Sequence, residues 1–292
     1  VLLNSDMRVE PDFLSPLLEP FSDSAVFSVS CQIFFSDATK RREETGLTQG
    51  WWEAGRFRFS HRVDDQVQDV FPCFYGGGGS SAYDRAKFLE LGGFDELLRP
   101  FYYEDTDLGY MAWKRGWKVL YHPRSVVYHE HRGTIGKKFS ATYIQGVLKK
   151  NAVLMHWKNI HSQRLLVSHF FQCFLSSFSA LLTGSRPGSF SFPGLGRAFL
   201  QLPQAMGARW KAHQLSSVSD HEALRRPWGG YFRDRFLAAH DPVPDRLRVL
   251  FVAPYAIEPP VHGGAVFMRL TLEELAPLAS VHVAGMVDRK CQ

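Results

Sequence analysis

The sequence is poor in cysteine, and the cysteines that it has are isolated. Four occur among 292 residues, and no two of them have the C-x-x-C spacing of a zinc or redox motif. They are Cys31, Cys73, Cys173 and Cys291. Isolated thiols are typical of a reduced compartment, so we predict a cytoplasmic protein.

Motifs for nucleic-acid and P-loop nucleotide binding are also missing. The sequence has no long basic helix and no zinc-finger spacing, so we do not expect nucleic acid as a partner. The glycine run from Gly76 to Gly79 is not followed by Gly-Lys-Ser/Thr, which excludes a P-loop. Neither sign of charge dominates, because 34 basic and 29 acidic residues give a net charge of +5. This modest excess suits a phosphate-bearing substrate or an anionic membrane surface and selects neither.

No long hydrophobic run is free of polar residues. The longest candidate, LLVSHFFQCFLSSFSALLTG (165–184), follows Arg164 and contains His169, Gln172 and several serines. A helix that spans a bilayer needs about 20 predominantly apolar residues. We therefore interpret this run as a helix that packs on the domain or lies on the membrane surface, which leaves a peripheral contact at the inner face of the membrane open.

The composition is that of a folded globular protein, with 45% apolar and 22% charged residues. No secretory signal is visible, and the chain begins at Val1 inside an apolar run. We interpret this beginning as an internal position in a longer protein.

The order of predicted elements is that of an α/β protein. We expect residues 1–3 to be the end of a buried strand. We expect the succession of helices and strands to be interrupted by a linker, which a final β-loop-α-β unit follows. The predicted elements are a helix between Pro11 and Pro20, a strand at 25–35, a loop at 36–70, a helix at 84–91 ended by Gly92, a helix from Asp105 to Gly116, two strands separated by Pro123 and Arg124, helices within 141–183, a linker at 215–246 and the final unit at 247–292.

Three acids open the helix in FYYEDTDLGYMAWKRGWKVLYHPRSVVYHEH (101–131). Glu104, Asp105 and Asp107 lie where helix capping and the helix dipole favour negative charge. Capping explains one or two of them, and three in four positions exceed what a cap needs. One carboxylate at this point could act as a general base toward a hydroxyl group while another caps the helix.

Two further groups could bind a metal ion. Asp6 follows the first strand at the sheet edge where open α/β sheets bind ligands, although Asn4-Ser5-Asp6 is also a plain turn sequence. His129 and His131 are two residues apart on a predicted strand and so point to the same face. Histidines at this spacing can ligate a metal, and they are also common as ordinary strand residues.

Three other features could contact a substrate. Gly77 and Gly78 would let a ligand approach the backbone closely, or they form only a flexible hairpin. Trp52 could stack on a sugar ring, or it covers the underside of a loop. Lys137, in HRGTIGKK, could hold phosphate oxygens, and a solvated basic turn explains it equally well.

Taken together, three segments resemble the family 2 glycosyltransferases, which are inverting enzymes with a GT-A fold. They are LLNSDMRVEPDFL, YGGGGSSAYDRAKFLELGGFDE and YYEDTDLGYMAWKRGWKVLYHPRSVVYHEH. The resemblance implies that Asp6 and His129 ligate Mg²⁺ or Mn²⁺ and that Asp105 is the catalytic base. It places Asn4 where the first acid of the family's D-x-D motif often stands, and it places Glu104 beside the substrate.

The resemblance also implies a domain order and partners. Residues 1–140 match the C-terminal part of a GT-A domain, 141–214 a helical extension with a possible membrane association, and 215–246 a linker. Residues 247–292, with PPVHGGAVFMRL, resemble the start of a family 4-like GT-B domain with a Rossmann-like fold. The implied partners are a nucleotide-sugar donor and a glycan or lipid-linked acceptor.

Two alternatives to a glycosyltransferase stay open at this stage. The first is a non-catalytic module that binds a nucleotide sugar or a glycan, which Asn4 in place of an acid would suit. The second is a metal hydrolase built on His129 and His131, which would activate water instead of a sugar hydroxyl.

Overall fold

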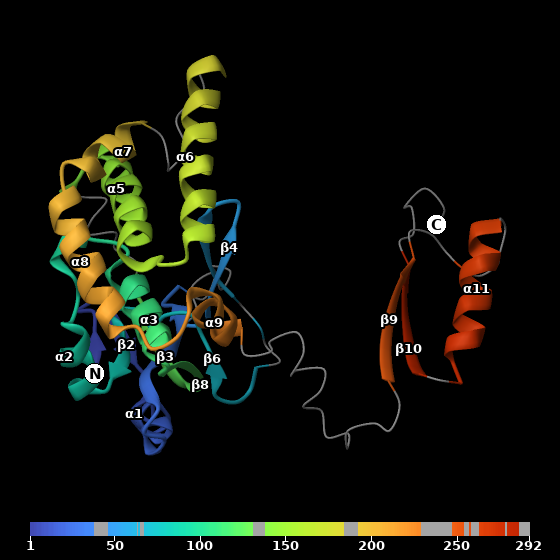
Figure 1. Cartoon of the computed structure of the whole chain (residues 1–292). Helices are drawn as coiled ribbons and strands as arrows, with labels where there is room; N and C mark the ends of the chain where they lie inside the picture. The colour runs from blue at the N-terminus through green and yellow to red at the C-terminus, as the bar shows by residue number, and fades with distance from the viewer. Residues whose placement is uncertain are drawn as a thin grey trace. The chain divides into compact units, whose positions relative to one another are not determined.

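The computed structural model divides the chain into two compact units, Val1–Tyr231 and Phe232–Gln292, which we describe separately (Figure 1). The residues that the structure describes are 1–37, 46–62, 64, 67–130, 138–183, 192–228, 247–253, 257, 263–277 and 279–285.

The first unit is built on a six-stranded mixed sheet. Its strand order is β1-β7-β3-β8-β2, and β6 also pairs with β8. Only β3 and β8 run parallel among these pairs, and the others are antiparallel. The strands are β1 (Leu2–Leu3), β2 (Met7–Val9), β3 (Val26–Phe35), β6 (Phe71–Pro72), β7 (Ser80–Tyr83) and β8 (Lys118–His129).

Strand β3 supplies apolar side chains to both faces of the sheet, because its alternation is interrupted by an irregular register against β8 between Val26 and Ser28. Val29, Cys31 and Ile33 face one side, where they pack with Leu17 of α1 (Leu14–Leu18). Phe27 faces the other side and joins a larger core. The sheet is therefore covered on both faces, as expected for an α/β domain.

The larger core lies between the sheet, several helices that include α2 and α3, and a hairpin. It includes Phe74 of the loop after β6, Leu108 and Trp113 of α3, and Phe57 of the hairpin. The surrounding elements are α2 (Arg85–Leu91), α3 (Glu104–Arg115), β4 (Thr48–Glu53) and β5 (Arg56–His61). Asp84 accepts a hydrogen bond from the Lys87 N–H at the start of α2, and Gly92 and Gly116 end α2 and α3 in the left-handed conformation.

A helical layer follows the sheet. It consists of α5 (Ala141–Asn159), α6 (Gln163–Thr183), α7 (Phe192–Phe199), α8 (Leu202–Leu215), α9 (Asp220–Arg225) and the short turn η3 (Arg226–Trp228). Figure 1 shows α5 to α8 on the side of the unit away from α1, with the far end of α6 extending beyond its neighbours. Val153, Leu154 and Trp157 of α5 form a second core with α7 and α8. Among the helices that the structure describes, none is long and apolar enough to cross a membrane.

Two buried ion pairs attach this helical layer to α3. Lys114 Nζ lies 2.6 Å from Asp220 Oδ1, and both side chains are almost completely buried. Asp107 Oδ2 lies 2.6 Å from Lys158 Nζ, and Asp107 Oδ1 accepts a 2.6 Å hydrogen bond from Asn159. Because breaking a buried pair is costly, these contacts fix α9 and α5 against the helix that starts with Glu104 and Asp105.

The second unit contains one β-α-β arrangement. Strands β9 (Leu247–Ala253) and β10 (Ala279–Gly285) pair in parallel, and α11 (Gly263–Leu275) connects them. The apolar run LRVLFVA predicts a buried strand, but Leu250 and Val252 of β9 are exposed on a face that no other described residue of this unit covers. The predicted β-α-β unit is confirmed.

Several predicted elements differ from the structure. Residues 48–61, predicted as loop, form the β4–β5 hairpin, whose two-residue turn places Ala54 and Gly55 at positive φ. The two strands expected around Pro123 are one strand, β8, with a shift of register opposite Cys31 and Gln32 that accommodates the proline. Leu2 and Leu3 lie on an exposed edge strand instead of a buried one. Within the predicted linker, α9 and η3 are folded, and Asp220 is buried against α3.

Candidate functional site

The structure brings Asp6 and His129 together at one edge of the sheet. Strand β2 pairs with β8 so that Met7 lies opposite His129, and the Glu130 N–H donates to the Asp6 carbonyl at 2.8 Å. This register puts Asp6 Oδ1 3.4 Å from His129 Nε2. Both side chains keep some contact with solvent, at 27% and 13% exposure. The pair is therefore accessible to an ion or a small ligand.

The donor atoms of this pair fit a divalent cation. A carboxylate oxygen and an imidazole nitrogen bound to one cation, each at about 2.1 Å, lie about 3 Å apart. The separation of Asp6 Oδ1 and His129 Nε2 is close to this value. In the described part of the chain, no group of three or more His, Cys, Asp or Glu residues could hold a metal ion. Two protein ligands leave room for phosphate oxygens and water, which is how magnesium sites in nucleotide-dependent enzymes are usually completed.

Asn4 connects this pair to the loop that contains Gly76 to Gly79, which we call the glycine-rich loop. The Asn4 N–H donates to the Gly79 carbonyl at 2.9 Å, and the Met7 N–H donates to the Asn4 carbonyl at 3.1 Å. A Cβ atom on Gly79 would lie 2.2 Å from Cγ of Asn4. Glycine at this position is therefore needed for the Asn4 amide to lie against the loop.

The same loop contacts Asp105 on its other side. The Gly78 N–H lies 3.4 Å from Asp105 Oδ2, and the Thr106 N–H donates to Asp105 Oδ1 at 2.7 Å. Burial raises the pKa of Asp105, and the hydrogen bonds from Thr106 and Gly78 act in the opposite direction. A raised pKa makes the carboxylate a stronger base, which favours removal of a proton from a hydroxyl group.

The backbone before Asp105 has an unusual conformation. Tyr102 and Tyr103 have φ values of 72° and 77°, in the left-handed region that side chains with Cβ rarely adopt. The Asn151 side chain of α5 holds this segment by donating to the carbonyls of Phe101 and Tyr102 at 3.0 and 2.9 Å. Strain of this kind is concentrated at functional sites, where the surrounding structure maintains it.

The three acids of α3 have different environments. Asp107 is fully buried between Lys158 and Asn159, so its position is structural. Glu104 is half-buried, and its Oε2 atom has no hydrogen-bond partner among the described residues. Burial raises the pKa of Glu104, and the charges of Asp105 and Asp107 add to this effect. Of these three acids, Asp105 is the one that contacts the glycine-rich loop. The three acids thus have different surroundings, as expected if one of them acts on a substrate while another has a structural role.

Trp52, another predicted site residue, is not brought to this group. Trp52 packs in the core against Phe57 and His156, with ring centroids 5.4 and 5.6 Å away. Strand β4 contacts Tyr75, the residue before the glycine run, through Thr48. Trp52 is four residues further along this strand, which places its Cα atom about 13 Å from that of Thr48. Lys137 and His131 lie outside the described residues, so their predicted roles stay predictions.

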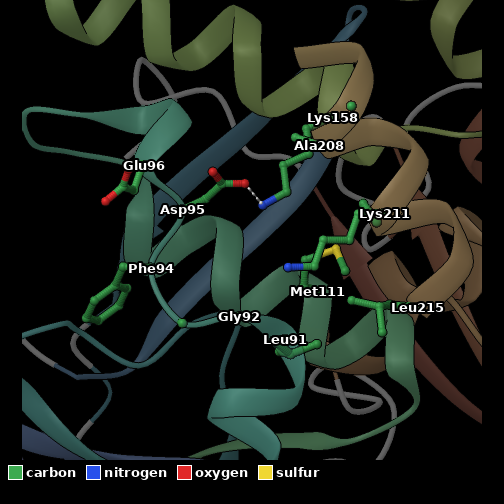
Figure 2. Close-up of a pocket in the computed structure, with 13 residues that line it drawn as sticks. Leu91, Gly92, Phe94, Asp95, Glu96, Met111, Lys158, Ala208, Lys211 and Leu215 are labelled. Carbon is green, nitrogen blue, oxygen red and sulfur yellow. Dashed lines mark ion pairs between the residues drawn. The ribbon is translucent and has the colours of Figure 1, made fainter. Parts of the chain in front are cut away.

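A cavity of about 280 Å³ lies between α3, α8 and the loop after α2. Figure 2 shows Asp95 paired with Lys158 at one wall, at 2.7 Å, and Lys211 extending from α8. Phe94 is directed away from Lys211 in Figure 2, and its ring tip would lie 3.6 Å from a Cβ on Gly78. The cavity is thus separated from the glycine-rich loop by the ring of Phe94.

Two supporting residues were not identified from the sequence. Asn151 and Lys158 hold the start of α3 from positions about 50 residues away in the chain. Neither belongs to a local pattern, and no signal in the sequence links them to Asp105. The segment GGFDE contains Asp95, which caps the helical turn that follows it. That cap is recognisable in the sequence, whereas the ion pair of Asp95 with Lys158 is not.

The Asp6–His129 pair, the glycine-rich loop and the half-buried carboxylate of Asp105 thus lie along one continuous path, which defines a site suited to group transfer from a phosphate-bearing donor. Residues 1–213 match the family described as "Glycosyl transferase family group 2". The chain belongs to this family. The predicted resemblance to family 2, the α/β fold class and the assignment to glycosyltransferases are confirmed, and the match continues beyond residue 140 into α8. The resemblance of residues 247–292 to a family 4-like domain stays a prediction.

Individual proteins show weaker similarity. "Putative polypeptide N-acetylgalactosaminyltransferase 10" of Drosophila melanogaster is 28% identical over 148 aligned residues, which cover 47% of this chain and 22% of that protein. The crystal structure of GalNAc-T7 with UDP, GalNAc and Mn²⁺ has 18% sequence identity and a TM-score of 0.49, and the match covers 83% of this chain and 41% of that one. The chain therefore spans less than half the length of either protein.

Proposed function

We propose that this protein transfers a sugar from a nucleotide-diphosphate donor to a hydroxyl acceptor, with a divalent cation and with inversion at the anomeric carbon. The observation that carries the proposal is the continuous path from the Asp6–His129 pair through Asn4 and Gly79 to Gly78 and Asp105. Membership of a glycosyltransferase family supports the reaction class. A relative named for N-acetylgalactosamine transfer supports a sugar as the transferred group.

Asp105 acts as the general base in this proposal. Its carboxylate is held by the Thr106 and Gly78 N–H groups at the start of α3. As the acceptor oxygen attacks the anomeric carbon, its proton passes to Asp105, and the bond between that carbon and the donor diphosphate breaks. A positioned base of this kind contributes about 10²–10⁴-fold in rate.

Asp6 and His129 hold Mg²⁺ or Mn²⁺ in this proposal. When bound, the cation neutralises the negative charge that develops on the departing diphosphate. Asn4 and the backbone at Gly77 and Gly78 bind donor oxygens beside it, and Glu104 contacts the acceptor or donor hydroxyls. The unpartnered Glu104 Oε2 atom supports a polar ligand at that position.

The base assignment is tested with Asp105→Asn. The amide oxygen of asparagine can still accept the shorter hydrogen bond, from Thr106, and only the 3.4 Å contact with the Gly78 N–H is lost. We therefore expect the fold to persist while turnover of the donor with acceptor falls by about 10²-fold or more. Asp12→Asn, which changes an exposed acid before α1, is the matched control and should leave turnover unchanged. Normal turnover in Asp105→Asn would disprove its role as the base.

Metal and stereochemistry need separate measurements. We expect chelation to abolish transfer, and Asp6→Asn and His129→Gln to weaken Mn²⁺ binding measured calorimetrically in the presence of the nucleotide. The anomeric configuration of the product, read by NMR, tests inversion, and a product with the configuration of the donor would exclude it. If the protein binds the donor tightly but never turns it over with any acceptor, the alternative function of a nucleotide-sugar-binding module, which Asn4 suits, would replace transfer.

A further inference from the structure

Helix α6 has an arrangement of side chains opposite to that of an ordinary surface helix. The residues that it buries against the rest of the unit are His169, Cys173 and Ser177, spaced four residues apart. His169 stacks on His156 of α5 at 4.7 Å and lies 3.0 Å from the Gly55 carbonyl. Beyond the first turn, where Leu165 and Leu166 pack against the larger core, small and polar groups therefore form the attached side of this helix.

Five large apolar side chains of α6 face outward instead. They are Val167, Phe171, Phe174, Phe178 and Leu182, at the i, i+4, i+7, i+11 and i+15 positions of one helical stripe. Phe171 and Phe174 are 61% and 65% exposed. The stripe is about 22 Å long at the rise of an α-helix. Contiguous exposed apolar surface of this size marks an interaction site.

The apolar surface continues onto α7 and α8. Phe170 of α6 and Phe199 of α7 both contact Trp157, with ring centroids 6.4 and 5.0 Å away. Together with Met206 they line a shallow cavity of about 240 Å³. Phe170, Phe199 and Met206 are each exposed over about half of their surface or more, so the two helical regions share one apolar surface.

Charge in this part of the chain has one sign only. Residues 131–219 contain eleven lysines and arginines and no aspartate or glutamate, although the whole chain has a net charge of only +5. The excess of positive charge is thus confined to the segment that includes α5 to α8. Arg164 at the start of α6, Arg197 of α7 and Lys211 of α8 are exposed.

We propose that the outward stripe of α6, with the adjoining apolar surface of α7 and α8, docks on the surface of an anionic lipid bilayer. Helices that lie in a membrane interface combine an apolar stripe with basic residues, and each basic residue near an anionic surface strengthens binding about fivefold. Such a helix need not cross the bilayer, which agrees with the hydropathy of the described helices. The docked surface would keep the protein beside a lipid-linked acceptor at the inner face of the membrane.

Vesicle flotation tests this proposal on the whole protein. The probes are vesicles of phosphatidylcholine alone and of phosphatidylcholine mixed with phosphatidylserine in equal parts. We expect the protein to float with the mixed vesicles and not with the neutral ones. Phe171→Ser with Phe174→Ser should reduce binding about tenfold or more, because two phenylalanines no longer enter the interface.

Control variants on α2 test whether a loss of vesicle binding is specific to the proposed docking surface. Leu89→Ser removes a similarly exposed apolar residue, 57% exposed on α2, and should not change vesicle binding. Arg164→Gln with Arg197→Gln should weaken binding to mixed vesicles about 25-fold, whereas Arg85→Gln on α2 should have no effect. Circular dichroism and a urea midpoint confirm that each variant is folded.

Three outcomes would overturn the proposal. The first is equal binding of neutral and anionic vesicles, and the second is unchanged binding of the Phe171/Phe174 variant. The third is self-association of the free protein that this variant abolishes, measured by light scattering, without any flotation. That result would assign the stripe to a second copy of the chain. Failure of sugar transfer would leave all three readouts unaffected, because none of them depends on the proposed reaction.

Discussion

Replacing Asp220 by alanine should strongly destabilise the first unit. The Asp220 carboxylate accepts from Lys114 Nζ at 2.6 Å, from the Tyr110 hydroxyl at 3.0 Å and from the backbone N–H groups of His161 and Ser162 at 2.7 and 2.5 Å. Its removal leaves the ammonium group of Lys114, 2% exposed, buried without a counter-charge. Removing one partner of a buried ion pair costs about 3–5 kcal/mol, which is a large part of the stability of a typical domain.

Urea unfolding followed by circular dichroism gives the measurement. We expect the midpoint of the first unit to fall sharply for Asp220→Ala and by an intermediate amount for Asp220→Asn, which keeps an acceptor but not the charge. Glu222→Ala is the matched control, because Glu222 lies on the same helix and pairs with Arg225 and Arg226 in contact with solvent. Exposed pairs contribute little. Equal midpoints for Asp220→Ala and Glu222→Ala would show that the buried pair does not hold α9 on α3.

Acid adds a second test of the same contact. Burial acts to raise the pKa of Asp220, but the charge and hydrogen bond of Lys114 and the two N–H groups outweigh it, so the pKa is lowered. The unfolded state therefore binds a proton more readily than the folded one. This contribution to stability is present above the ordinary aspartate pKa and is lost as the pH falls below it. Asp220→Asn should remove that part of the acid dependence.

Three further changes probe the site and its support. Gly79→Ala should lower transfer up to about 10²-fold because the Asn4 amide must move, whereas Gly77→Ala, whose nearest contact is 3.0 Å away, should have a smaller effect on the same assay. Asn151→Ala should lower the free energy of unfolding in urea by about 1–3 kcal/mol, because it removes the hydrogen bonds to the segment before Asp105. It should also reduce transfer, because Tyr103 can leave its positive-φ conformation and move Asp105. A loss of stability without any loss of transfer would show that Asn151 does not position Asp105. Burial lowers the pKa of His169 to about 4, so this residue should contribute a loss of stability of about 3 kcal/mol as the pH drops from 6.5 toward 4. His169→Gln should make the fall in urea midpoint between the two pH values smaller by that contribution, and His156 and His161, whose pKa values are also lowered, should retain theirs.

Local chemistry made part of the fold predictable. Asp84 and Gly92 delimit α2, and Gly116 ends α3, because caps and left-handed glycines act within a few residues of the chain. The hairpin was missed although Ala54 and Gly55 form a two-residue turn, because the polar residues around the tryptophans masked the alternation of β4 and β5. The single strand through Pro123 depends on a shift of register against β3, which is a property of the pairing and not of the strand alone.

The candidate site was predictable to the extent that its residues lie in recognisable segments. The proximity of Asp6 and His129 follows from the pairing of β2 with β8, and the structure bears out that they are neighbours. Their roles, and that of Asp105, stay predictions until they are measured. Asn151 could not be found, because a side chain that binds carbonyls 49 and 50 residues away leaves no periodic pattern in the sequence.

The turn from Asn4 to Asp6 has a geometric consequence for the sheet. It links β1 and β2, which stand at the two ends of the strand order and are four inter-strand steps apart. In a flat sheet these steps would amount to about 19 Å. The four steps along the backbone from Leu3 to Met7 reach at most about 14 Å. The sheet must therefore curl around this connection, so lengthening it by two residues would let the curl open and draw Asn4 away from the histidine on β8.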